Sequence, residues 1–435
     1  MKILYISQYY PPEIGAPAAR VSELARHWVK EGHQVTVLTG FPNHPTGIVP
    51  PEYRSKLSRL VYREQMSGVD VVRTWLFPCP NRKVHERLLN YLSFVLSACI
   101  TGIFLRKPHI IIATSPQLFV GLIGRWLGWL KRVPFTFEVR DLWPESITAS
   151  GIGRETDFSI RVLHGLSSFL YRFSDHIVVV TRAFKDQLVD NWQVPVEKLS
   201  VVENGVEARL FDPVGPKVSF DRGTDNKFIV SYIGTLGLAH GLETLIKAAS
   251  HLQNVSVDIH FLCIGEGAEK ERLYSLVSEH KLQNMSFLPQ QPRDQIPAII
   301  RASHVCLVLL KKAPVFETVI PTKMLEFMAC GRPIILGVNG QAREIVEAAK
   351  AGICIEPEDC GALASAVTRL YMDVELREEL GRNGREYIIK HLTRERTSAT
   401  YMKVLESVLR NAGRMRNQST SASGKGDDCI ATSTE

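Results

Sequence analysis

The segment VFETVIPTKMLEFMACGRPII, residues 315–335, carries side chains whose types and spacing suit the binding of an anion. Lys323 and Glu326 are three residues apart, so they share one face of the helix that we expect to begin after Pro321. A lysine at a helix N-terminus opposes the helix dipole, and this placement makes sense when an anion lies between the two side chains. Glu326 would then accept hydrogen bonds from ribose hydroxyls, and Gly331 would end the helix.

Two other segments, each running from an expected strand into a helix, are rich in small residues. Residues 232–249 contain Gly234, Gly237 and Gly241, which free the backbone to wrap around a diphosphate. The earlier segment QYYPPEIGAPAAR places Gly15 before a helix, where backbone N–H groups favour anions. It lacks the G-x-G-x-x-G spacing of a dinucleotide site. An ordinary tight turn explains residues 232–249 equally well. For Gly15 taken alone, an ordinary tight turn is the favoured interpretation.

A fourth segment, EVRDLWPES, gathers charge at the end of an expected strand. Glu138, Arg140, Asp141 and Glu145 lie at or just beyond the carboxyl end of strand 134–139. A solvated charged loop is the plain alternative. The density of charge at the carboxyl end of a strand favours a site.

The elements that must position these residues follow an alternating pattern. Strands that alternate with helices predict βαβ units and a parallel sheet covered on both faces. In the N-terminal half we expect strands at 2–7, 34–39, 69–74, 109–114, 134–139 and 176–181, and helices near 17–31, 86–106, 117–131, 156–173 and 182–191.

The pattern restarts after residues 213–227, which are rich in proline, glycine and charge and which we interpret as a linker between domains 1–212 and 228–392. We expect strands at 228–233, 257–264, 284–288, 304–309, 333–337 and 353–356, helices near 241–252, 267–280, 293–302, 322–330, 341–349, 359–371, 373–390 and 393–412, and a disordered tail over 413–435. The expected fold class is α/β, with two Rossmann-like doubly wound parallel sheets facing a central cleft. Ligands bind at the carboxyl ends of such sheets, so that cleft is the expected active site.

The composition is that of an ordinary globular protein. Of 435 residues, 45% are hydrophobic and 22% are charged, which excludes a disordered, collagen-like or coiled-coil chain. The eight cysteines form no Cys-x-x-Cys pair and lie near no histidine cluster with zinc-ligand spacing, so we expect reduced thiols in a cytosol. The first apolar run, ILYIS, is short and is soon followed by Pro11 and Pro12, which does not fit a signal peptide.

Positive charge is concentrated in one stretch. Between Phe41 and Phe137 there are 13 Lys and Arg against 4 Asp and Glu, a balance of +9, whereas the whole chain carries +7. The same stretch holds the apolar run 88–105, which we interpret as a buried or surface-lying helix because a membrane span needs about 20 predominantly apolar residues. Run 118–132 mixes tryptophan with Arg and Lys and fits a membrane interface and an ordinary amphipathic helix equally. We expect this domain to dock on an anionic membrane.

Taken in order, these segments resemble the retaining glycosyltransferases of family 4, which have the GT-B fold. Within that family they look most like transferases for bacterial surface polysaccharides, including fucosamine-type and colanic-acid sugars. The resemblance covers about residues 1–412 and is carried by KILYISQYYPPEIGA, FEVRDLWPES, VVENGVE, YIGTLGLAHGLETLI and PTKMLEFMACGRPII followed by GICIEPED.

The resemblance implies that the second domain binds a nucleoside diphosphate sugar, with UDP or GDP as its nucleotide, and that the first domain binds the acceptor. Glu326 would match the second Glu of the family's E-x7-E motif and hold the ribose. Asn204 and Gly205 match the "NG" just before the hinge, and the last helix would cross back onto the first domain. The residues implied in donor binding are Gly15, Gly234, Thr235, His240, Thr322, Lys323 and Glu326.

The sequence departs from the family pattern at several of these positions. The first Glu of E-x7-E falls at Thr318, and Glu317 is one residue away, so either the spacing is stretched or another group contacts the donor sugar. Relatives often carry an Arg and a Lys where this chain has Thr235 and His240, and a His where it has Arg140. The charge of a diphosphate must then be met by Lys323, backbone N–H groups and His240.

The reaction implied is transfer of a sugar to a hydroxyl acceptor, such as a lipid-linked glycan, with retention at the anomeric carbon. Lys323, Glu317, Arg140 and Asp141 are the catalytic candidates, the last two for orienting the sugar or the acceptor. The chain has no Asp-x-Asp triplet for a metal, and we expect metal-independent, front-face transfer. The resemblance also implies a cytoplasmic enzyme, peripheral on the inner face of the cytoplasmic membrane.

Two other functions share this architecture. A nucleotide-sugar 2-epimerase would use the donor without an acceptor. A degenerate paralogue would act as a binding subunit, which the Thr at position 318 motivates. Nucleic-acid binding is not expected, because the basic residues are not part of any recognised nucleic-acid motif.

Overall fold

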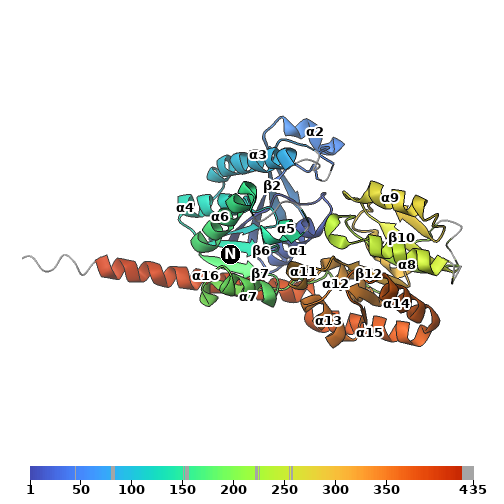
Figure 1. Ribbon diagram of the computed structural model, residues 1–435. Helices are drawn as coiled ribbons and strands as arrows, with labels where there is room; N and C mark the ends of the chain where they lie inside the picture. The colour runs from blue at the N-terminus through green and yellow to red at the C-terminus, as the bar shows by residue number, and fades with distance from the viewer. Residues whose placement is uncertain are drawn as a thin grey trace, which may run out of the picture.

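The computed structural model describes residues 1–44, 46–79, 84–149, 151, 156–220, 224, 226–253, 255 and 258–423. They form two α/β domains, one from each half of the chain, which stand side by side in Figure 1 in blue to green and in yellow to orange. Each domain is built on one sheet of predominantly parallel strands. The predicted fold class is confirmed.

The first domain holds an eight-stranded sheet in the order β3-β4-β2-β1-β5-β6-β7-β8. Its strands are β1 Lys2–Ile6, β2 Gln34–Gly40, β3 Val61–Met66, β4 Val69–Thr74, β5 Ile110–Thr114, β6 Phe135–Val139, β7 His176–Val179 and β8 Leu199–Val201. Neighbouring strands run parallel except for the edge hairpin of β3 and β4. Strands β3 and β8 were not predicted, because β3 mixes charged with apolar residues at an exposed edge and β8 has three residues.

Helices cover both faces of this sheet. They are α1 Ala16–Lys30, α2 Pro51–Leu57, α3 Val84–Ile103, α4 Val120–Lys131, α5 Glu145–Ala149, α6 Phe158–Phe173 and α7 Arg182–Asp190. Side chains of β1 alternate between the faces. Leu4 and Ile6 enter the core shared with α3 and α4, whereas Ile3 and Tyr5 enter the core shared with α1. The short helices α2 and α5 were not predicted.

The second domain holds a six-stranded, all-parallel sheet in the order β11-β10-β9-β12-β13-β14. Its strands are β9 Phe228–Ile233, β10 Ile259–Ile264, β11 Met285–Leu288, β12 Val305–Leu309, β13 Ile334–Gly337 and β14 Gly352–Cys354. Its helices are α8 Glu243–Gln253, α9 Lys270–Glu279, α10 Ile296–Ala302, α11 Pro314–Glu317, α12 Thr322–Ala329, α13 Gln341–Ala349, α14 Cys360–Met372 and α15 Val374–His391. All six strands were predicted, each to within two residues at either end.

The chain then returns to the first domain through α16, Arg394–Ser423, which packs against α1 (Figure 1). The return point is fixed by two backbone hydrogen bonds, from Val206 N–H to Leu392 C=O and from Arg394 N–H to Val206 C=O. Gly205 is required here, since a Cβ at this position would lie 2.5 Å from the Thr397 hydroxyl.

The predicted last helix ended at 412, and disorder was expected from 413. That expectation is wrong for residues 413–423, because α16 continues to Ser423. A helix already anchored by packing gains one hydrogen bond for each further residue, so polar residues can prolong it. Residues 424–435 lie outside the described part of the chain. Among the described helices, none combines the length and the apolar character that a membrane span needs.

Candidate active site

The two domains meet through the segments that the sequence analysis singled out. Helix α11, which ends at Glu317, contacts α5, which begins at Glu145. A second contact comes from Arg293, in the loop before α10, which forms ion pairs with Glu23 on α1 and Glu326 on α12. The interface therefore joins α12 to the helix that follows Gly15.

Lys323 holds its ammonium group in a buried position on α12. Its Nζ atom is shielded from solvent and has no hydrogen-bond partner among the described residues. It lies 4.0 Å from the ring centroid of Tyr232, which gives a cation–π contact but no counter-charge. Burial lowers the pKa of Lys323 to about 7, and Glu326 nearby only partly opposes this shift. An anion bound at this point would supply the missing charge and the missing hydrogen bonds.

The loop after β9 brings backbone close to this ammonium. Gly234 has φ +148°, and a Cβ at this position would stand 3.0 Å from Lys323 Nζ. Only glycine both adopts this backbone conformation and leaves the space open. Thr235 is exposed beside it, and its carbonyl accepts a hydrogen bond from the Tyr232 hydroxyl. Gly234, Thr235 and Lys323 thus lie together, as predicted.

His240 lies near the same ammonium but does not add positive charge. Its Nδ1 atom lies 3.3 Å from the Leu309 carbonyl. Burial and the neighbouring Lys323 lower the pKa of His240 to about 3, so the ring is neutral at physiological pH. It can offer a ligand a hydrogen bond, but not the cationic charge for a diphosphate.

Glu326 is buried on α12 and is already engaged. Its Oε1 atom accepts a hydrogen bond of 2.9 Å from Arg293, whereas Oε2 has no donor among the described residues. Burial raises the pKa of Glu326, and Arg293 opposes that rise. Arg293 was not predicted as a site residue, because its loop sequence, PQQPRDQ, shows no motif.

The position of the first family Glu is occupied by a side chain with a local role. The Thr318 hydroxyl is buried and donates a hydrogen bond of 2.6 Å to the Val315 carbonyl. Glu317 is exposed and lies beside Gly340, where an added Cβ would come within 2.8 Å of the Glu317 Cβ. Thr322 is the first residue of α12 and is partly buried. A carboxylate is therefore present near the family position, but on the neighbouring residue.

On the first domain, Arg140 is the counterpart of Lys323. Its Nη2 donates to the carbonyl of Ala16, next to Gly15 at the start of α1, while Nε and Nη1 are buried without a partner among the described residues. Burial and the neighbouring Arg20 lower the pKa of Arg140 to about 10, so it remains a cation. Arg140 and Gly15 are brought together, and unused donors gather at a helix N-terminus that favours anions.

Asp141 shapes the turn that follows β6. Its carboxylate accepts a hydrogen bond of 3.2 Å from the Trp143 indole, and burial raises its pKa. The other two acids of this segment are also paired within the domain: Glu138 with Arg20, and Glu145 with the Trp192 indole. Arg140 keeps two buried donors, and Glu145 one buried oxygen, without a partner among the described residues.

A pocket of about 140 Å³ is lined by residues of both domains. One of them is Glu13, two residues before Gly15 in the sequence. The pocket lies between the loops after β1 and β2, and Gln290 of the second domain completes it. The Glu13 carboxylate accepts backbone N–H bonds from Tyr10, Asn43 and His44, and burial raises its pKa to about 7. This pocket was not predicted, because no motif marks the loop after β2.

Two family models together span most of the chain. The model described as "Glycosyl transferase 4-like domain" matches residues 15–205, and the model described as "Glycosyl transferases group 1" matches residues 217–387. The chain belongs to the family 4 glycosyltransferases. This match favours a transferase over the epimerase considered above.

Known proteins resemble this glycosyltransferase along nearly its whole length. The Escherichia coli protein WcaI, which is named for colanic acid biosynthesis, is 26% identical over 84% of this chain and 91% of its own. Sucrose-phosphate synthase from Thermosynechococcus elongatus superposes with a TM-score of 0.71 at 20% identity, covering 94% of this chain and 99% of its own. Anabaena HepE in complex with UDP-glucose gives a TM-score of 0.69 at 18% identity, covering 94% and 100%. The fold is thus GT-B.

No group of three or more His, Cys, Asp or Glu side chains in the described part of this glycosyltransferase is placed to hold a metal ion. The metal independence of its reaction stays a prediction.

An apolar face lies on the outer side of the first domain, over three neighbouring helices. Helix α4 contacts both α3 and α6. The large exposed side chains on these helices and just beyond α3 are Leu88, Leu89, Leu92, Leu96, Ile100, Ile103, Phe104, Trp126, Trp129, Leu130, Phe158, Val162, Phe169 and Phe173. We call this set the α3–α4–α6 face. The contribution of α6 was not predicted.

Proposed function

We propose that this glycosyltransferase transfers a sugar from a nucleoside diphosphate, UDP or GDP, to a hydroxyl acceptor with retention. The observation that carries the proposal is the set of buried cationic donors without an acceptor among the described residues, Lys323 Nζ beside Gly234 and Arg140 Nε and Nη1 near Gly15. Unpaired buried charge is costly, so two such groups at one domain interface indicate a ligand with more than one negative charge.

Charge builds on the diphosphate as its bond to the sugar breaks, so fixed donors at that point lower the barrier. Lys323 would serve the leaving group from the second domain, with Gly234, Thr235 and Thr322 around it. Arg140 would reach the phosphates or the sugar from the first domain, and Asp141 would keep the turn that presents it. With its low pKa, Lys323 would take up a proton when the diphosphate binds.

Retention is proposed to proceed on the front face of the sugar, where the departing diphosphate assists the incoming hydroxyl. Glu317, exposed at the end of α11, is the carboxylate nearest the family position and would contact the donor sugar. We propose no covalent glycosyl-enzyme intermediate and no catalytic metal.

The acceptor would enter from the side of the first domain. Among the residues that the structure describes, the pocket around Glu13 is lined by two acids and no Lys or Arg, which suits the hydroxyls of a sugar better than a phosphate. A lipid-linked glycan is the proposed acceptor class, with its sugar at the interface and its lipid in a membrane. WcaI is named for colanic acid biosynthesis, which supports a role in making a bacterial surface polysaccharide such as O-antigen, capsule or exopolysaccharide.

The α3–α4–α6 face supports a peripheral position on the inner face of the cytoplasmic membrane. Exposed apolar patches of this kind are uncommon on monomeric soluble proteins. The Trp126 and Trp129 rings are tilted against each other on α4 with centroids 5.5 Å apart, and Arg125 lies 5.9 Å from the Phe173 ring on α6. Aromatic and basic side chains together suit an anionic bilayer surface.

The test supplies radiolabelled UDP- or GDP-sugars together with a bacterial membrane lipid extract. We expect label to move to an organic-soluble product only when both donor and lipid are present. Donor that changes in the absence of lipid would indicate an epimerase instead. A protein that shows no thermal shift with UDP or GDP and no label transfer would be a binding subunit of another kind.

A further inference from the structure

One guanidinium is shared between the two domains. Arg293 Nη1 donates to Glu326 Oε1 at 2.9 Å within the second domain, and Nη2 donates to Glu23 Oε1 at 2.7 Å across the interface. The Glu23 side chain is 3% exposed and the Glu326 side chain 12% exposed, so neither ion pair is a surface contact. The Arg293 guanidinium also lies 5.2 Å from the Phe211 ring.

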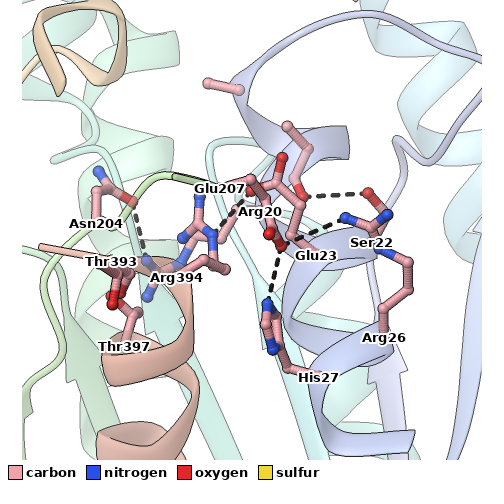
Figure 2. A network of polar contacts seen from close by, with 12 residues as sticks. Arg20, Ser22, Glu23, Arg26, His27, Asn204, Glu207, Thr393, Arg394 and Thr397 are labelled. Carbon is pink, nitrogen blue, oxygen red and sulfur yellow. Dashed lines mark hydrogen bonds and ion pairs between the residues drawn. The ribbon is translucent and has the colours of Figure 1, made fainter. Parts of the chain in front are cut away.

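Glu23 also pairs with a second arginine, at the start of α16. Arg394, the first residue of α16, donates from Nε to Glu23 Oε2 at 2.8 Å, and Figure 2 shows these two side chains facing each other between α16 and α1. Each Glu23 oxygen therefore holds a different arginine. Since Arg394 fixes the orientation of the carboxylate, Oε1 has a defined position from which to accept Arg293 Nη2.

This sharing determines which oxygen of Glu326 remains open. The five N–H donors of an arginine form a fork that matches a carboxylate in a bidentate pair. Arg293 does not form such a pair with Glu326, because its Nη2 donates to Glu23 instead. Glu326 Oε2 is left without a donor among the described residues. Although burial lowers it, the two carboxylates hold the pKa of Arg293 above its ordinary value, so the fork stays charged.

We propose that Arg293 is a positioning residue that makes the ribose subsite depend on domain closure. With the domains closed, Glu23 holds one arm of the fork and Glu326 Oε2 is free to accept from a ribose hydroxyl. When Glu23 moves away, the fork closes on Glu326 as a bidentate pair and covers that oxygen. The inference rests on the proposed function, in which Glu326 receives the ribose. By linkage, the nucleotide then favours the closed state as much as closure favours the nucleotide.

The test measures UDP binding by calorimetry on the full chain. Glu23→Gln should raise the Kd of UDP about tenfold, which corresponds to 1.4 kcal/mol. Binding of 2′,3′-dideoxy-UDP, which offers Glu326 no ribose hydroxyl, should be unchanged by the same substitution. Glu207→Gln is the matched control, because Glu207 pairs with His27 and Arg26, which lie on the same helix as Glu23 (Figure 2), and its ion pairs in the described part of the chain do not include Arg293.

A double-mutant cycle tests whether Glu23 acts through Arg293. In an Arg293→Gln background, Glu23→Gln should change the Kd of UDP by less than about twofold, the usual error of additivity. Three results would overturn the proposal: unchanged UDP binding in Glu23→Gln, equal weakening of UDP and the dideoxy analogue, or additive effects in the double variant. If Glu23→Gln fails to fold, Glu23→Asp replaces it in the comparison of UDP with its dideoxy analogue, because the shorter side chain keeps a negative charge beside Arg394 but withdraws from Arg293.

Small-angle scattering separates this proposal from the proposed function. If the wild-type chain binds neither UDP nor GDP, the proposed function fails. The bridge still predicts that Arg293→Gln widens the unliganded particle relative to wild type and to Glu207→Gln. Identical scattering from wild type and Arg293→Gln would show that the bridge does not hold the domains closed.

Discussion

Two buried charges in this molecule differ in how they are paired. Glu138, at the end of β6, is fully buried and holds Arg20 at 2.9 Å and the Tyr5 hydroxyl at 2.7 Å. The other Arg20 donors reach Asn204 (Figure 2) and the Val202 carbonyl. Lys323, on α12, has none of this: its ammonium is buried against one aromatic ring with no acceptor among the described residues.

The difference separates a structural charge from a charge that we propose to be functional. A buried ion pair with every hydrogen bond satisfied is complete before any ligand arrives, so its residues stabilise the fold. A buried cation without a partner costs stability, and a fold retains it where a ligand completes it. Charged residues that are neighbours in the sequence, such as Glu138 and Arg140, fall on opposite sides of this division.

The largest expected effect is a loss of stability when Glu138, the paired charge, is neutralised. Glu138→Gln leaves Arg20, which is 1% exposed, without its counter-charge, and breaking a buried pair in this way costs about 3–5 kcal/mol. The urea midpoint of the first domain should fall accordingly. The control is Arg272→Gln, which breaks two ion pairs of an arginine about half exposed to solvent and should leave the midpoint unchanged. Equal midpoints for the two variants would contradict the structural role of Glu138.

Replacing Lys323, the unpaired charge, should lower activity without lowering stability. Lys323→Ala removes the donor aimed at the leaving diphosphate, so turnover should drop about 100–1000-fold, or about 3–4 kcal/mol. The control is Lys270→Ala, because Lys270 also lies over a ring, that of Tyr274, but is paired with Glu266. Turnover should be unchanged in that variant. Near-normal turnover in Lys323→Ala, or a large loss of stability, would place Lys323 among the structural charges.

The pH dependence of stability gives a third test of the same comparison. The pKa of Lys323 is lowered by burial to about 7, well below that of an unfolded lysine, so between pH 7 and 10 the unfolded chain binds more protons at this site. Stability should therefore rise with pH across this window in wild type relative to Lys323→Met, by up to about 1.4 kcal/mol per pH unit. Bound UDP should abolish the difference by restoring the charge. Parallel pH profiles for the two proteins without ligand would contradict it.

Much of the fold follows from the sequence because periodicity is local information. The buried strands 228–233 and 304–309 are continuous apolar runs and were predicted within a residue of β9 and β12. The edge strand β3 was missed because exposed positions carry no apolar pattern. The placement of Lys323 beside Gly234 was predicted because both positions match family motifs.

The pairing of charges could not be predicted in this way. Arg293 meets Glu23 across 270 positions of sequence, and the contact depends on how the two domains close. Glu13 lies in a motif that was read only for its glycine, and its three hydrogen-bond donors come from two loops. Such partners are brought together by the tertiary structure, and no regular spacing in the sequence marks them.

The smallest effect on stability is expected on the α3–α4–α6 face, where the comparison of paired with unpaired cations recurs. Lys131 donates to the carbonyls of Ile103 and Leu105 at the end of α3, so Lys131→Glu should destabilise the domain. Arg125 lies over the Phe173 ring and holds no acceptor among the described residues, so Arg125→Glu should change stability by less than about 0.5 kcal/mol. Flotation with anionic vesicles at low salt should nevertheless weaken in Arg125→Glu and in Trp129→Ala, with UDP binding intact. If both variants float like wild type, this face does not dock on membranes, and its exposed aromatic side chains need another partner.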